Sequence, residues 1–223
     1  MCGLYRHFRI RINAMRTLKR LVVGLVLAAS AAWAQAPVES GWVPLFNGKD
    51  LSGWKNNGAE KWVVENGEIV GESTAARYGY LTTEKTYRDF LLRVRFKCDG
   101  TGNYGVFLRS RIIGEGENGP DIEGTQVEVD PERDTGGIYE SGGRGWIAQS
   151  SKESARAIKP SDWNELEIAI EGKHVVTRLN GVQIVDYYDP APRFMDGVVG
   201  LQLHTGGGAK VHWKDIFIRE IGK

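Results

Sequence analysis

The stretch from Phe90 to Cys98 has the sequence Phe-Leu-Leu-Arg-Val-Arg-Phe-Lys-Cys, in which apolar and largely polar positions alternate. Alternation is the pattern of a β-strand with one buried face, because successive side chains of a strand point to opposite sides. The buried row would consist of Phe90, Leu92, Val94, Phe96 and Cys98, with Cys98 as a buried thiol. The sequence therefore predicts a long strand that covers a core with one face.

Turn signals extend this pattern along the chain. The pairs Asn66-Gly67 and Asn180-Gly181 each separate two apolar-rich segments, and Asn-Gly is favoured where a two-residue hairpin turn needs positive φ. No segment keeps a helical period over three turns, although residues 151–158 could form a short helix. Many antiparallel strands without a repeat of ~40 residues predict an all-β protein, a jelly-roll sandwich of two antiparallel sheets.

The same pattern predicts the core and the loops. The last strand changes parity near Lys214 and Asp215, which predicts a bulge. Residues 114–124 and 131–160 are too irregular for strands, and we expect them to be long loops, where binding residues usually lie. The expected core residues are Trp62, Phe90, Val94, Phe96, Ile168, Ile170, Leu201, Leu203, Ile216 and Ile218.

The N-terminal region has the features of a secretory signal peptide. Arg16, Lys19 and Arg20 precede an apolar run over residues 21–32, and Ala32-Trp33-Ala34 offers small residues for cleavage. The run is shorter than the ~20 residues of a spanning helix. We expect an N-terminal extension and signal peptide over 1–34, with translation starting at Met1 or Met15. An uncleaved signal anchor is the alternative.

Residues 35–223 would then form a single domain that is secreted or periplasmic. Their 189 residues suffice for one well-buried core. Loss of the leader removes six of the 29 Lys and Arg residues and none of the 28 Asp and Glu residues, which leaves 23 against 28, a net charge of −5. This balance disfavours nucleic acid as a partner, and no later segment is apolar enough for a membrane span. Cys98 is the one cysteine left, so no intramolecular disulfide is available.

One predicted strand carries a polar face that suits chemistry. Gln126, Glu128 and Asp130 share one side of this strand, opposite Val127 and Val129. An amide and two carboxylates offer hydrogen-bond acceptors, a candidate base and hydroxyl recognition. We therefore expect a functional site on this face.

A series of motifs follows one order along the chain: Pro44–Trp54, Gly102–Arg109, Gly124–Asp130, Thr135–Tyr139, Trp163-Asn164, Asn180-Gly181 and Val199–His204. Together they resemble the 3-keto-disaccharide hydrolase domain family, formerly a domain of unknown function. The resemblance covers about residues 42–221. It implies a concanavalin-like, laminin-G-like jelly roll and action on glycosides that are already oxidised to a ketone at C3. Exported bacterial proteins are typical of the family.

A ketone at C3 changes how a glycosidic bond can be broken. The ketone acidifies the C2 proton, so a base can remove it and the enolate can expel the C1 substituent by β-elimination. Water then adds to the enone, and the net reaction is hydrolysis. This route needs a base, an electrophile for the enolate oxygen and an acid near the leaving group. It does not need the paired carboxylates of most glycosidases.

Three residues are expected to be catalytic in such a reaction. Glu128 is expected to be the base, and Arg109 and His204 to be its polarising or proton-donating partners. A carboxylate and an amide often stand in the reverse order in the family, whereas this chain has Gln126 before Glu128, which leaves open which carboxylate is the base. For Arg109, which could hold Glu128 or bind sugar oxygens, the alternative is a structural ion pair between neighbouring strands.

Carbohydrate binding is expected from the same polar face and from the glycine-rich segment 136–146. An aromatic side chain beside an acid and an arginine fits a sugar, which has apolar ring faces edged by hydroxyls. The alternative for Trp146 is that it plugs the edge of the sandwich. The expected substrate-binding residues are Gln126, Asp130, Tyr139, Glu140, Arg144, Trp146 and Gln202.

No metal ligand or cofactor is assigned. The acidic segment 114–124 contains enough oxygen ligands for calcium but does not have EF-hand spacing, so calcium is kept only as an alternative. Two other functions stay open: a non-catalytic carbohydrate-binding module, and a classical glycosidase that pairs Glu128 with Asp130 or Glu140. The sequence does not indicate an oligomeric state.

Overall fold

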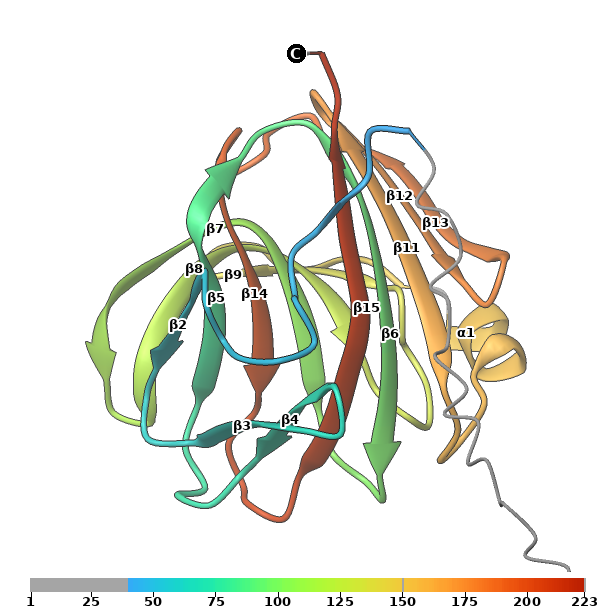
Figure 1. Ribbon diagram of the computed structural model, residues 1–223. Helices are drawn as coiled ribbons and strands as arrows, with labels where there is room; N and C mark the ends of the chain where they lie inside the picture. The colour runs from blue at the N-terminus through green and yellow to red at the C-terminus, as the bar shows by residue number, and fades with distance from the viewer. Residues whose placement is uncertain (1–39, 150, 223) are drawn as a thin grey trace, which may run out of the picture. The chain divides into compact units, whose positions relative to one another are not determined.

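Two antiparallel sheets form the part of the chain that the computed structural model describes, residues 40–149 and 151–222 (Figure 1). The all-β jelly-roll prediction is confirmed. The first sheet has the order β13 (Val182–Tyr188), β12 (His174–Leu179), β11 (Asn164–Glu171), β6 (Phe90–Asp99), β15 (Lys210–Glu220), β4 (Glu68–Glu72) and β3 (Lys61–Glu65), and β1 (Val43–Pro44) also pairs with β15. The second has the order β10 (Gly145–Ala148), β9 (Ile138–Ser141), β8 (Gly119–Val129), β7 (Tyr104–Gly116), β14 (Gly197–Leu203), β5 (Gly79–Tyr87) and β2 (Trp54–Asn57).

The core lies between the two sheets. Along β6, buried residues alternate with partly exposed ones from Phe90 to Cys98, as the sequence pattern predicts. All ten expected core residues are buried, and so is Trp213, whose ring lies 6.0 Å from that of Phe96. The thiol of Cys98 is buried and free. Each sheet therefore buries one face, and the other face of the second sheet is left for function.

Turns and a bulge occur where the sequence predicts them. Asn66 and Gly67 have φ values of 53° and 79° between β3 and β4, and Asn180 and Gly181 have 51° and 82° between β12 and β13. Both pairs therefore make the positive-φ hairpin turns that Asn-Gly favours. The register of β15 against β6 shifts between Lys214 and Phe217, which confirms the bulge.

The prediction of two long loops is largely wrong. Residues 114–124 belong to the hairpin of β7 and β8, in which Gly116 pairs with Gly119. Residues 131–160 contain β9, β10 and the helix α1 (Ser151–Ala157). Register shifts after Leu108 and after Ile112 interrupt the alternation of β7, so a test for strict period two does not detect the outer part of the hairpin.

The predicted leader, residues 1–34, lies outside the described residues, so it stays a prediction. Among the residues that are described, no helix is long and apolar enough to span a membrane.

Candidate functional site

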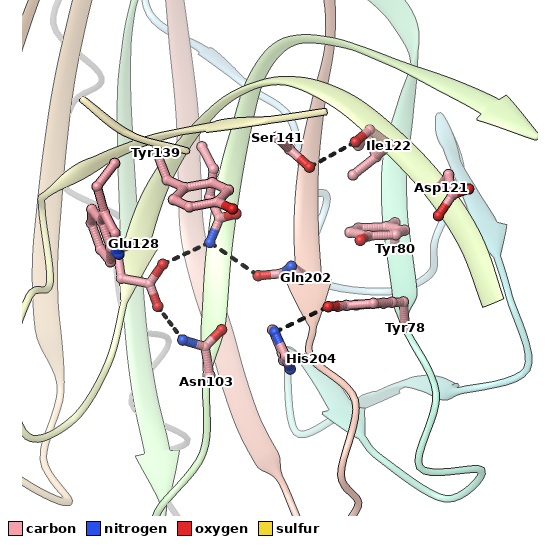
Figure 2. A pocket seen from close by; sticks show the side chains of 12 residues that line it. Tyr78, Tyr80, Asn103, Asp121, Ile122, Glu128, Tyr139, Ser141, Gln202 and His204 are labelled. Atoms are coloured by element: carbon pink, nitrogen blue, oxygen red, sulfur yellow. Dashed lines mark hydrogen bonds between the residues drawn. The ribbon is translucent and has the colours of Figure 1, made fainter. Parts of the chain in front are cut away.

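A polar pocket of about 350 Å³ lies on the second sheet. Figure 2 shows side chains pointing into it, among them Glu128 from β8, Gln202 from β14 and His204 just after β14. Its lining consists of Tyr78, Tyr80, Asn103, Asp121, Ile122, Gln126, Glu128, Tyr139, Ser141, Trp146, Gln202 and His204.

The pocket faces away from the core because of the alternation along β8. Val127 and Val129 are fully buried in the core, so Gln126 and Glu128 point to the opposite side of the sheet. In the register of the sheet, Gly105 on β7 pairs with Glu128 on one side and with Gln202 on the other. Three adjacent strands therefore bring these side chains together.

Gly105 allows the polar side chains to meet above β7. A Cβ atom at this position would lie 2.8 Å from Gln126 Nε2 and 2.9 Å from Gln202 Oε1. Gln126 Nε2 donates hydrogen bonds to Glu128 Oε2 at 2.8 Å and to Gln202 Oε1 at 3.2 Å (Figure 2). Any larger residue in place of Gly105 would push the side chains of Gln126 and Gln202 apart and break the hydrogen bond between them.

Glu128 is a buried carboxyl held by two amides. It is 3% exposed, its Oε2 accepts from Gln126, and its Oε1 accepts from Asn103 Nδ2. Burial raises the pKa of Glu128 to about 8, and the negative charges of Asp130 and Asp134 act in the same direction. The hydrogen bond from Asn103 opposes this rise. A carboxyl with such a pKa is a suitable general base near neutral pH.

A tyrosine and a histidine form a second polar pair in the pocket. Tyr78 Oη and His204 Nε2 lie 3.2 Å apart, and their rings meet edge to face at 4.8 Å. Tyr78 follows a loop that is fixed by the buried carboxylate of Glu60, which accepts the backbone N–H of Ala75 at 3.0 Å and of Arg77 at 2.7 Å. This pair can donate or relay a proton.

Aromatic side chains provide the remaining walls. Burial raises the pKa of the Tyr80 phenol, so its hydroxyl stays a hydrogen-bond donor. Tyr139 on β9 pairs in register with Gln126 on β8. Its ring meets that of Trp146 edge to face at 5.6 Å. Trp146 is 42% exposed, so it borders the pocket and does not plug the sandwich.

The structure does not bring Arg109 to this site. Its side chain is 1% exposed, and its guanidinium donates to the carbonyl of Arg88, to Gly172 O at 2.7 Å and to Asp89 Oδ1 at 2.6 Å. Arg109 has a φ of 48° at the bulge of β7, and the bulge redirects its side chain. The expectation that Arg109 holds Glu128 is therefore wrong, and the alternative of a structural ion pair is observed.

Three of the expected substrate-binding residues also lie outside the pocket. Asp130 follows the last residue of β8, and its Oδ1 caps a turn by accepting from the backbone N–H of Glu132 at 2.8 Å. Arg144 Nε donates to Glu140 at 3.0 Å, and Arg144 Nη1 donates to Asp189 at 2.9 Å. Glu140 and Arg144 therefore fasten the β9–β10 hairpin to the end of β13.

The other expected residues converge. Gln126, Glu128, Tyr139, Trp146, Gln202 and His204 all line the pocket. The pocket is also lined by residues that the sequence did not predict: Tyr78, Tyr80, Asn103, Asp121, Ile122 and Ser141. Of these, Asn103 lies inside the motif Gly102–Arg109, and its place in this motif could have identified it as a site residue. Within residues 40–149 and 151–222, no group of three or more His, Cys, Asp or Glu residues could hold a metal ion.

Known proteins resemble this chain in sequence and in fold. A model of the 3-keto-alpha-glucoside-1,2-lyase-like domain matches residues 41–219. A Bacteroides thetaiotaomicron protein named 3-keto-disaccharide hydrolase is 29% identical over 107 residues, which are 43% of this chain and 37% of that relative. The match therefore spans little more than a third of the relative's length.

Two solved structures share the fold at low sequence identity. A candidate glycosyl hydrolase from Parabacteroides distasonis superposes with a TM-score of 0.61 at 21% identity, over 82% of this chain and 94% of that one. The carbohydrate-binding module CBM66 from Bacillus subtilis superposes with a TM-score of 0.56 at 18% identity, over 75% and 96%. At these identities the likeness concerns the fold alone.

Replacing Arg109 tests its structural role. We expect Arg109→Ala to lower the free energy of unfolding by about 3 kcal/mol, because it removes a buried side chain and leaves its three partly buried acceptors unpaired. The matched control is Lys61→Ala, which removes an exposed ion pair with Glu72 and should cost about 0.5 kcal/mol. Urea denaturation measures both values. Equal small losses in the two variants would contradict the structural role.

The pKa of Glu128 has a consequence for stability. Because this pKa is raised from 4.5 to about 8, the native state binds more protons than the unfolded state between these values, and stability falls as pH rises. Between these two pKa values, we expect the free energy of unfolding of Glu128→Gln to rise relative to that of the wild type by up to about 1.4 kcal/mol per pH unit. Above about pH 8 the difference should stay constant. Urea denaturation from pH 4 to 9 measures the difference, and a difference independent of pH would refute the raised pKa.

Proposed function

Because the chain belongs to the family of 3-keto-alpha-glucoside-1,2-lyase-like domains, we propose that it cleaves the glycosidic bond of 3-keto-glycosides. The reaction is removal of the C2 proton, β-elimination of the C1 substituent and hydration of the product. The observation that carries this proposal is the buried carboxyl of Glu128, which lies in a pocket and is held through both oxygens by amides.

Glu128 takes the C2 proton. Its two amide donors fix the orientation of the carboxylate, and its burial keeps the pKa near 8. A base with this pKa is stronger than an exposed glutamate and is still substantially ionised in mildly alkaline solution. This matches the task of removing a proton from carbon beside a ketone.

Neutral donors stabilise the enolate oxygen. No lysine or arginine is among the described residues that line the pocket, so we assign this task to neutral side chains. Tyr80 keeps its phenolic proton, and Gln202 presents an amide beside it (Figure 2). Donors that already point into a pocket lower the energy of a developing negative charge without reorganisation.

The pair of Tyr78 and His204 donates a proton to the leaving group. As the enolate forms the C1–C2 double bond, the C1–O bond breaks and the leaving oxygen takes a proton from this pair. Water then adds to C1, its proton returns to the pair, and Glu128, which exchanges the abstracted proton with solvent, protonates C2. Atoms and charges balance, and the enzyme returns to its initial state.

The aromatic wall accommodates the leaving group. Trp146 is partly exposed beside Tyr139, and sugar rings pack their apolar faces on such side chains. A pocket of about 350 Å³ is within the size range of small-molecule sites.

Export completes the proposal. It is supported by the basic residues, apolar run and Ala-Trp-Ala site of residues 16–34. N-terminal sequencing of the protein recovered outside the cytoplasm should give a chain that starts at Gln35. An intact N-terminus on exported protein would contradict cleavage there.

The second candidate function is sugar binding without cleavage. It is favoured by the fold likeness to the CBM66 carbohydrate-binding module, because this fold serves binding as well as catalysis. A classical glycosidase that pairs Glu128 with Asp130 or Glu140 is less well supported, because Asp130 and Glu140 lie outside the pocket.

One assay separates these functions. A nitrophenyl 3-keto-glucoside and its unoxidised parent are incubated with wild-type protein and with Glu128→Gln, and release of nitrophenol is followed. We expect cleavage of the keto substrate only, and a loss of at least about 10²-fold in kcat for the variant with binding retained in calorimetry.

The other outcomes decide against the proposal. Binding of both sugars without cleavage would identify a binding module, and cleavage of the parent alone would identify a classical glycosidase. Full activity of Glu128→Gln would remove Glu128 as the base.

A further inference from the structure

Asn103 lies at the meeting point of the three strands that form the pocket floor. It immediately precedes β7, and its carbonyl accepts the backbone N–H of His204 at 3.2 Å. The next residue, Tyr104, pairs with Val129 of β8 and with Leu203 of β14. The backbone of Asn103 is thus fixed between the strand of the base and the strand of the histidine.

The side-chain amide of Asn103 is only half used. Its Nδ2 donates to Glu128 Oε1. Its Oδ1 is buried and has no hydrogen-bond partner within residues 40–149 and 151–222. By contrast, Gln202 Oε1 accepts from Gln126. A buried acceptor without a partner is costly, and in a pocket it is a place for a donor of the ligand.

The position of Glu128 beside Asn103 indicates which hydrogen-bond donor of the substrate can reach Asn103 Oδ1. Nδ2 and Oδ1 belong to one amide, so a group that bonds to Oδ1 lies next to the carboxylate that Nδ2 holds. In the proposed reaction this carboxylate faces the C2 hydrogen of the substrate. Of the groups on a 3-keto-glycoside, the C2 hydroxyl is attached to the same carbon as that hydrogen, and it can donate a hydrogen bond.

We propose that Asn103 binds the C2 hydroxyl and selects 3-keto-glycosides that carry it over their 2-deoxy and 2-O-methyl counterparts. This inference rests on the proposed function. One amide would then orient both reaction partners, since it holds the carboxylate of Glu128 through Nδ2 and the carbon that loses its proton through Oδ1. Substrates without the hydroxyl donor would leave Oδ1 buried and unpaired, which is a strong basis for discrimination.

The test compares kcat/KM for a nitrophenyl 3-keto-glucoside with that for its 2-deoxy counterpart. The ratio of the two constants is measured for wild type, Asn103→Ala and Gln126→Ala. The matched control is Gln126→Ala, because it removes the other amide donor of Glu128 and leaves Asn103 Oδ1 in place. Intrinsic differences in reactivity between the two substrates cancel when ratios of different variants are compared.

We expect the ratio to fall about ten- to hundredfold in Asn103→Ala and to stay near the wild-type value in Gln126→Ala. The same ratio in Asn103→Ala and wild type would overturn the inference while leaving the proposed function intact. An equal fall in both variants would also overturn it, because the effect would then act through Glu128.

A binding measurement covers the case in which Asn103→Ala is inactive. Calorimetry compares the affinities of methyl 3-keto-glucoside and its 2-deoxy counterpart for Glu128→Gln and for Glu128→Gln/Asn103→Ala. A preference for the 2-hydroxy sugar that disappears with Asn103 supports the inference, and a preference that persists overturns it. If wild type cleaves neither substrate, the proposed function fails, and the same binding preference still decides whether Asn103 reads the hydroxyl.

Discussion

The site depends on keeping a carboxyl buried without a cation beside it. Glu128 receives hydrogen bonds from two amides, and no described lysine or arginine lines its pocket. A neighbouring cation would lower the pKa of Glu128. Amides hold the carboxylate in place without adding a positive charge. Burial is therefore the largest influence on the pKa of Glu128, which stays at about 8. The negative charges of Asp130 and Asp134 raise the pKa of Glu128 further.

The sheet makes this arrangement possible. The side chains of Gln126 and Gln202 meet above β7 because Gly105 has no side chain to separate them. The register that pairs Gly105 with both Glu128 and Gln202 is in turn set by the core residues on the other face of the same strands. Packing on one side of the sheet thus determines the chemistry on the other.

The sequence predicted those parts of the structure that follow from local pattern. Alternation along β6 and β8 and the two Asn-Gly turns were sufficient for the fold class, the core and the polar face with Gln126 and Glu128. The prediction of site residues failed where a bulge or a strand end interrupts the alternation. The bulge at Arg109 turned an expected site residue into a structural ion pair, and Asp130 left the face because the strand ends before it.

Long-range placement could not be predicted from pattern. Tyr78 reaches the pocket because Glu60, 17 residues before Arg77, binds the loop that precedes Tyr78. Arg144 does not reach a sugar in the pocket because Asp189, 45 residues away, binds its guanidinium. Such contacts depend on which strands become neighbours in the sheets. The local alternation of apolar and polar residues in one sequence does not predict which strands these are.

Transfer of the C2 proton to Glu128 is the central claim, and isotope exchange at C2 tests it most directly. A 3-keto-glycoside deuterated at C2 is incubated in ordinary water, and loss of deuterium and cleavage are followed together by NMR. The account predicts a primary isotope effect on kcat/KM and deuterium-free product with the wild type, and neither exchange nor cleavage with Glu128→Gln. Cleavage that retains the C2 deuterium quantitatively would contradict it.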